Sequence, residues 1–412
     1  MAEPAAGVQG QPPIPWRAPF MRPGEVVAEG TNEPIEQRLT LHRLTPPPRY
    51  RYAEADFSKP DHVALIVDFL IRVYHQGYEI QTIADEKLVK WAIQRFWGAY
   101  NPDGYTVGPN VCVFRPDGYI CAFYGAMILG VQINGSQTMR WALATFKAYD
   151  RTHFPNEATL LRDLMFKSFF RHCKQVAFAT STIYDMQPMA TLTVYYRLLN
   201  VDLFEEEQFE PFLHAFQRQN ETTPQLLERV RTENSRVFLS PGWREMNIDD
   251  MPQVFRMLVD RNRECRYKLI PSFARQDDLT RLLLPNMDIP HCVKSYVYET
   301  RTAGLARKRT LQHEVVGFAT FYMTLTGCND DSFVKAHLYY HCPAPNTLQF
   351  YKDLFPLARR ARGDVFVSTG ACNVWAYAND IGLVDIGEKV HYCVTNWRCP
   401  PLLESEVGLL LL

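Results

Sequence analysis

The feature that most constrains the fold is an order of strand-like and helical segments that occurs twice along the chain. In the first half, strand-like runs at 111–114, 119–127 and 138–146 precede an amphipathic helix at 158–171. A further strand-like run follows at 176–180. Antiparallel strands that lead into a helix and then a parallel strand are typical of an α+β arrangement.

The second half of the chain repeats this order. A helical pattern at 249–260 comes first, and it is followed by strand-like runs at 293–298, 314–323 and 334–340, a helix at 348–361 and a strand at 364–368. The sequence therefore predicts an α+β fold of two similar lobes. Each lobe should contain a mixed, mostly antiparallel sheet flanked by helices.

Length and local composition suggest where the lobes divide. A chain of 412 residues is too long for one ordinary hydrophobic core. The run at 217–224 is polar and places a boundary near residue 225. We predict a flexible proline-rich arm at 1–45, an N-terminal lobe at 46–225 and a C-terminal lobe at 226–412.

Composition excludes several classes of protein. The formal net charge of −1 gives no electrostatic reason to expect a nucleic-acid partner. No apolar run approaches the ~20 residues that a membrane-spanning helix needs, and no secretory signal is recognisable, so we expect a cytoplasmic protein. The ten cysteines contain no Cys-x-x-Cys pair, and we predict neither a disulfide framework nor a metal site.

The last residues carry the most specific motif. Asn396 to Pro400 reads Asn-Trp-Arg-Cys-Pro, and Val-Gly-Leu follows at Val407 to Leu409. The chain resembles the N-myristoyltransferases here, because that family closes on Asn-Trp-Lys-Cys-Pro and Val-Gly-Leu. The departure is Arg398, which stands where the family has lysine.

Other parts of the chain are similar to the same family. In the second half these are 243–252, 315–322, 335–336 and 363–366; in the first half the match at 187–200 is thinner. The resemblance covers roughly residues 45–412. It implies two tandem lobes of the acetyltransferase (GNAT) type, the first binding acyl-coenzyme A and the second binding peptide.

The resemblance implies an activity and its substrates. Family members transfer a myristoyl group from myristoyl-CoA, a co-substrate rather than a tightly bound cofactor, to the N-terminal glycine of proteins. The catalytic base of the family is the α-carboxylate at the end of the chain, which here is Leu412. The oxyanion donors are backbone N–H groups, which the alignment assigns to Ala144 and Thr145. A monomer is expected.

The segment aligned with the family's coenzyme A site departs from its pattern. The family reads Arg-Ser-Lys-Arg-Val-Ala-Pro there, whereas residues 152–158 carry no lysine or arginine. Lost charge-assisted phosphate contacts would weaken binding, since each contributes roughly 1.5–3 kcal/mol. The cofactor-binding residues implied by the alignment are Phe146, Lys147, Arg151, Thr152, His153, Asn156 and Ala158.

Peptide recognition also differs from the family pattern. The acidic loop of the family is shorter here, with Asp85 where several acidic residues are expected. A changed peptide preference is therefore predicted. The aromatic residues expected to line the groove are Tyr195, Tyr196, Tyr267 and Tyr339.

Three functions remain open on this evidence. The first is a working glycylpeptide acyltransferase with an altered coenzyme A segment. The second is a catalytically impaired relative that binds a peptide or a lipidated N-terminus. The third is an acyltransferase that uses a shorter acyl-CoA.

Overall fold

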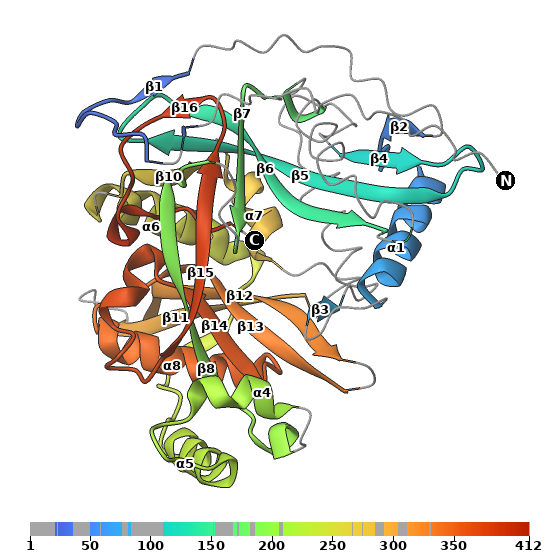
Figure 1. Cartoon of the computed structure of the whole chain (residues 1–412). Coiled ribbons are helices and arrows are strands. Elements are labelled where there is room, and N and C mark those ends of the chain that lie inside the picture. The colour runs from blue at the N-terminus through green and yellow to red at the C-terminus, as the bar shows by residue number, and fades with distance from the viewer. Residues whose placement is uncertain are drawn as a thin grey trace, which may run out of the picture.

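The structure is a computed structural model, and its shape is shown in Figure 1. It describes residues 21–22, 24–35, 50–57, 59–75, 81–83, 110–150, 152, 168–170, 173–181, 186–205, 209–265, 267–273, 275–284, 292–303, 311–328 and 331–411.

One large mixed sheet organises the described part of the chain. Its order is β2-β4-β5-β6-β7-β15-β8-β14-β13-β12-β11-β9, with β10 added to β5 and β3 added to β12. The strands are β1 (Glu33–Pro34), β2 (Arg51–Glu54), β3 (Gln81–Ile83), β4 (Val111–Phe114), β5 (Ile120–Ile133), β6 (Met139–Tyr149), β7 (Gln175–Thr180), β8 (Ala190–Leu198), β9 (Trp243–Glu245), β10 (Leu269–Ser272), β11 (Val293–Ala303), β12 (Leu311–Cys328), β13 (Asp331–Cys342), β14 (Val365–Thr369), β15 (Val384–Val394) and β16 (Trp397–Arg398).

Helices flank this sheet, which confirms the predicted α+β class (Figure 1). They are α1 (Pro60–His75), α4 (Glu210–Leu213), α5 (Thr223–Ser235), α6 (Met251–Glu264), α7 (Gln276–Leu283) and α8 (Thr347–Arg360), with short 3-10 helices that include η6 (Ala371–Ala376) and η7 (Glu404–Glu406). None of the helices among the described residues is long and apolar enough to cross a membrane.

The strand pairings of the two halves correspond, whereas the predicted helix at 158–171 lies outside the described residues except for 168–170. In the first half, β5 and β6 are antiparallel and β6 pairs with β7 in parallel. In the second half, β12 and β13 are antiparallel, and β13 pairs with β14 in parallel after α8. The two halves thus share one pattern of strand pairing.

The two halves also exchange strands. β8 comes from the first half, yet it pairs with β14 of the second half. β15 comes from the second half, yet it lies between β7 and β8 and pairs with both (Figure 1). The predicted boundary near residue 225 is therefore not a break in the sheet, because strands cross it in both directions.

The sequence pattern of α8 determines how the helix begins and which of its residues pack against the sheet. The side chain of Asn346 accepts a hydrogen bond from the backbone N–H of Gln349 (3.3 Å) and caps the first turn. Phe350, Leu354 and Leu357 then follow one another on the face that packs against the sheet, where they are buried beside β12 and β14. α8 therefore covers one face of the sheet in the second half of the chain.

Residues 24–35, within the segment predicted as an arm, contact the closing motif. β1 pairs with β16, and the Trp397 indole N–H donates to the Asn32 side-chain oxygen (3.1 Å). Glu25 forms an ion pair with Arg398 at 2.8 Å. The Trp397–Arg398 pair of the closing motif thus has a structural use, since it anchors this N-terminal segment.

Candidate active site

The parallel pairing of β6 with β7 ends abruptly in the middle of the sheet. It covers Trp141 to Ala144 on β6 and Gln175 to Phe178 on β7. β6 continues to Tyr149, and its register with β5 is interrupted by an irregularity at Ala144 to Phe146, opposite Gly125 and Ala126. The two strands therefore diverge beyond Ala144, and Thr145 lies at the start of this divergence.

β15 positions the C-terminal segment next to the end of the β6–β7 pairing. Tyr392 of β15 pairs with Ala179 of β7, the residue directly after the last one paired with β6. The Tyr392 hydroxyl accepts a hydrogen bond from the backbone N–H of Leu411 (3.1 Å). The chain just before its last residue is thus tied to the strand that borders the β6–β7 divergence.

Backbone hydrogen bonds hold the segment that leads to Leu411. Gly408 N–H donates to the Leu269 carbonyl (2.8 Å), and Cys372 N–H donates to the Val407 carbonyl (2.9 Å). Val407 and Leu409 are completely buried. Burial of a side chain of this size stabilises the fold by roughly 1.5–3 kcal/mol, so the segment is an integral part of the core.

Gly408 is required by the close approach of an aromatic ring. A Cβ atom at this position would lie 2.6 Å from Cδ2 of Tyr267. The Tyr267 hydroxyl accepts a hydrogen bond from the Arg261 guanidinium (3.2 Å), which fixes the ring. This contact leaves no room for a side chain at the glycine of the Val-Gly-Leu motif.

Arg261 forms hydrogen bonds with two segments that lie near the C-terminal segment. Its buried guanidinium donates to the carbonyl of Cys372 (2.9 Å) and to the carbonyl of His341. It therefore links α6 to β13 and to the loop that receives Val407. A buried arginine held by several acceptors is costly to disturb, because removal of the partners leaves an unsatisfied charge.

Aromatic and polar side chains cover the sheet face near Tyr392. Tyr322 stacks on His337, with ring centroids 4.5 Å apart and planes 6° apart. Tyr339 meets Tyr322 edge-on at 5.7 Å. Burial raises the pKa of Tyr322, Tyr339 and Tyr392, so all three hydroxyls stay protonated at neutral pH.

Two predicted groove residues face different sides of the sheet. Tyr195 packs with the cluster around α8. Tyr196 is buried in another cluster, lies edge-on to Phe216 and donates its hydroxyl hydrogen to Glu388. Because neighbouring side chains of a strand alternate between faces, one groove cannot take both residues. Lys335 lies on the Tyr196 side, with its Nζ 5.7 Å from that ring.

The predicted catalytic and cofactor-binding residues are only partly described. Ala144 is the last β6 residue paired with β7, and the backbone of residues 145–147 continues the strand. Thr152 is exposed, and its N–H donates to the carboxylate of the buried Asp150 (3.0 Å). Arg151, His153, Asn156, Ala158 and Leu412 lie outside the described residues.

Sequence reasoning missed Tyr392, Tyr322, His337 and Arg261. A signal existed for Tyr392, since the apolar run before Asn396 alternates with polar residues as a strand does. No local pattern distinguishes Arg261 from the other arginines of α6. Its importance comes from carbonyls that are distant in sequence.

Comparison with known proteins adds independent findings. Residues 212–408 match the model of the family "Myristoyl-CoA:protein N-myristoyltransferase, C-terminal domain". A probable glycylpeptide N-tetradecanoyltransferase of Caenorhabditis elegans is 24% identical, over 95% of this chain and 84% of the relative. Glycylpeptide N-tetradecanoyltransferase 1 of Arabidopsis thaliana is 27% identical, over 42% of this chain and 38% of the relative.

A solved structure has the same fold over most of its length. The Saccharomyces cerevisiae N-myristoyltransferase with bound myristoyl-CoA superimposes with a TM-score of 0.75. The match covers 96% of this chain and 93% of the yeast chain at 15% sequence identity. The two chains therefore share a fold at low sequence identity.

The contact between Gly408 and Tyr267 generates a stability prediction. Gly408→Ala should lower the free energy of unfolding by about 1–3 kcal/mol, because the added methyl group overpacks the Tyr267 ring. Denaturant titration measures this loss. The same substitution in a Tyr267→Ala background should cost clearly less, since the obstructing ring is gone. An equal cost in both backgrounds would contradict the assigned contact.

The buried histidine on β13 generates a pH prediction. Burial, and secondarily Lys335, lowers the pKa of His337 to about 3, while its Nε2 lies 2.8 Å from the Thr324 hydroxyl. The unfolded chain binds this proton near pH 6.5, so stability should fall as pH drops from 6.5 toward 3. Between pH 6.5 and 4.5, His337→Gln should show a shallower loss in denaturant titrations. Identical slopes for the two proteins would refute this assignment.

Proposed function

Because the chain belongs to the N-myristoyltransferase family, we propose that it transfers a long acyl group from acyl-coenzyme A to the N-terminal glycine of a protein. The observation that carries the proposal is the position of the C-terminal segment. Leu411 is tied to Tyr392, beside the place where β6 and β7 diverge. The family match of residues 212–408 supports the same reaction.

The reaction needs a base, an oxyanion site and room for two substrates. The glycine amine attacks the thioester carbon, so a C–N bond forms and the C–S bond breaks. The carbonyl oxygen carries negative charge in the tetrahedral intermediate. The amine gives up its proton to the base, and the coenzyme A thiolate leaves and is protonated.

The C-terminal segment supplies the proposed base. The proposal assigns this role to the α-carboxylate of Leu412, which follows Leu411, the residue whose N–H is held by Tyr392. The buried Val407 and Leu409 fix the path of the chain up to that point. In the proposed reaction this carboxylate accepts a proton from the ammonium group of the glycine.

Backbone groups supply the proposed oxyanion site. Ala144 and Thr145 lie where β6 leaves β7, so their N–H groups are candidates to face a thioester carbonyl rather than a neighbouring strand. The acyl-CoA would enter along the same opening, with Phe146 and Lys147 on its β6 side. The candidates for the coenzyme A end remain Arg151, Thr152, His153, Asn156 and Ala158. Arg151 and the neighbouring Lys147 are the lysine and arginine residues of the predicted cofactor-binding set.

The peptide would lie on the sheet face that Tyr392 and Tyr339 share. Tyr322 and His337 cover that face next to Tyr339. Tyr196 lies further along β8 with Lys335 and Glu388. Tyr267 is engaged with Gly408 and Arg261 and therefore positions the C-terminal segment rather than the peptide.

The direct test is an acyl-transfer assay on the full chain. Incubation with myristoyl-CoA and a panel of peptides that begin with glycine should give peptides heavier by one myristoyl group in mass spectrometry. The same peptides with an acetylated N-terminus should stay unchanged, because they have no free amine. Absence of product on every glycine peptide would contradict the proposed activity.

A binding measurement distinguishes two explanations for an absence of product: the chain does not bind acyl-CoA, or it prefers peptides outside the panel. At a hundred times its dissociation constant, myristoyl-CoA should stabilise the fold by about 2.7 kcal/mol and raise the unfolding midpoint by roughly a few degrees. Coenzyme A without an acyl chain should act more weakly. If neither ligand shifts the midpoint, the chain has lost its acyl donor and the alternative, a peptide-binding relative, replaces the enzyme.

Tyr392 should act as a positioning residue. Tyr392→Phe removes the acceptor of the Leu411 N–H and leaves the ring packing intact. We expect kcat to fall by about 10–100-fold, since a small displacement of a catalytic group has effects of this size. Acyl-CoA binding should not change. Tyr298→Phe, which alters a partly buried tyrosine of β11, is the matched control. An unchanged kcat in Tyr392→Phe would refute the positioning role.

A further inference from the structure

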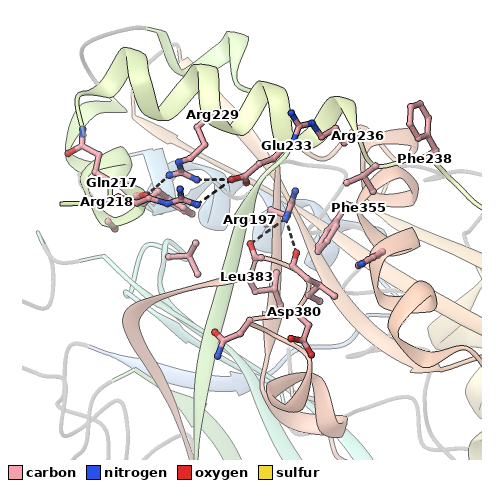
Figure 2. Close-up of a pocket in the computed structure, with 18 of the residues that line it drawn as sticks. Arg197, Gln217, Arg218, Arg229, Glu233, Arg236, Phe238, Phe355, Asp380 and Leu383 are labelled. Atoms are coloured by element: carbon pink, nitrogen blue, oxygen red, sulfur yellow. Dashed lines mark hydrogen bonds and ion pairs between the residues drawn. The ribbon is translucent and has the colours of Figure 1, made fainter. Parts of the chain in front are cut away.

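A second site candidate lies on the outer side of the second half of the chain. It is a pocket of about 880 Å³ between α5, α8 and residues 379–384 (Figure 2). None of the residues that line it belongs to the candidate active site. Pockets of roughly 300–1,000 Å³ are large enough to enclose a ligand.

The pocket carries a local excess of positive charge. Five cationic side chains line it, with two acidic ones: Arg197, Arg218, Arg229, Arg236 and Lys352, against Glu233 and Asp380. The whole chain has a net charge of −1, so this excess of three positive charges is a local feature. A concave surface of one sign concentrates the field and attracts ligands of the opposite sign.

Existing ion pairs neutralise only part of this charge. Arg229 forms an ion pair with Glu221 (2.8 Å), a residue outside the pocket lining, and Glu233 is shared by Arg229 (3.4 Å) and Arg218 (3.5 Å). Within the described ranges, the ion pairs include none that involves Arg236 or Lys352. These two cations come from different helices, at the end of α5 and within α8. They are therefore available to an incoming anion.

Arg197 supplies a buried cation on the pocket wall. Only 8% of its surface is exposed, and its Nη1 donates to the Ile381 carbonyl (2.8 Å). Its Nε is buried without a hydrogen-bond partner in the described part of the chain. Burial lowers the pKa of Arg197. The negative charge of Glu233 raises this pKa, whereas the positive charges of Arg359 and Arg229 lower it. A ligand carboxylate nearby would offset the cost of keeping this charge buried.

The shape and the remaining lining fit a chain-like ligand. Gln217 and Arg218 lie before the start of α5, whereas Arg236 and Phe238 follow its end (Figure 2). A helix of 13 residues spans about 20 Å, so the pocket is elongated along it. Phe238 is 78% exposed at one end and offers an apolar contact. Gln349 and Asn379 can hydrogen-bond with a peptide backbone.

We propose that this pocket binds an acidic peptide segment of a partner protein. Carboxylates of the segment pair with Arg236 and Lys352, and an apolar side chain packs on Phe238. The elongated shape and the separated cations favour an extended peptide over a single phosphate group. This inference does not depend on the acyltransferase proposal.

Fluorescence anisotropy with the full chain tests the proposal. The probe is a labelled peptide rich in glutamate with leucine at intervals, compared with the same peptide in which glutamine replaces glutamate. The glutamate peptide should bind, and added salt should weaken it. Arg236→Ala and Lys352→Ala should each lower its affinity by about tenfold, as expected for loss of one charge-assisted contact. Phe238→Ala should lower the affinity as well.

The controls make each outcome decisive. Arg256→Ala removes an exposed arginine of α6 outside the pocket and should leave binding unchanged. Arg197 is left intact, because it holds the 379–384 segment. Equal affinity for the glutamine peptide, or equal binding by Arg236→Ala and Lys352→Ala, would overturn the proposal. Tighter binding of inorganic phosphate or ATP in competition would overturn it too, because the pocket would then be a small-anion site.

Discussion

The pairing of β15 between β7 and β8 is the interaction on which the rest of the structure depends. β15 connects two parts of the sheet. One part ends at β7 of the first half, and the other begins at β8, which pairs with β14 of the second half. It also places Tyr392 next to the end of the β6–β7 pairing. Without β15 the sheet would have two unpaired edges in its centre, and the C-terminal segment would lose its support.

The C-terminal segment is at once a structural and a functional element in this account. Val407 and Leu409 are buried in the core, and Gly408 lets the chain pass against Tyr267. The same hydrogen bonds that stabilise the fold therefore determine where the end of the chain lies. The Val-Gly-Leu motif therefore has a structural role of its own, independent of any part in the reaction.

The sequence was informative where local chemistry decides structure. Strand and helix periods predicted β4, β12 and α8, and the parallel strand expected late in each half is present as β7 and β14. β15 and the strand exchange were not predicted, because pairing between distant segments leaves no local pattern. Part of the predicted arm is a strand, since β16 supplies partners that composition does not reveal. Tyr195 and Tyr196 show the same limit: both were predicted to line the groove, whereas strand alternation places them on opposite faces of the sheet.

The central claim is that the end of the chain takes part directly in acyl transfer. The measurement that tests it is the turnover of a variant with one glycine added after Leu412, in parallel with the unaltered chain. The account predicts that turnover is lost while the unfolding midpoint and its shift with myristoyl-CoA are retained, since the added residue displaces the α-carboxylate and not the buried core. Unchanged turnover in the extended chain would contradict the account.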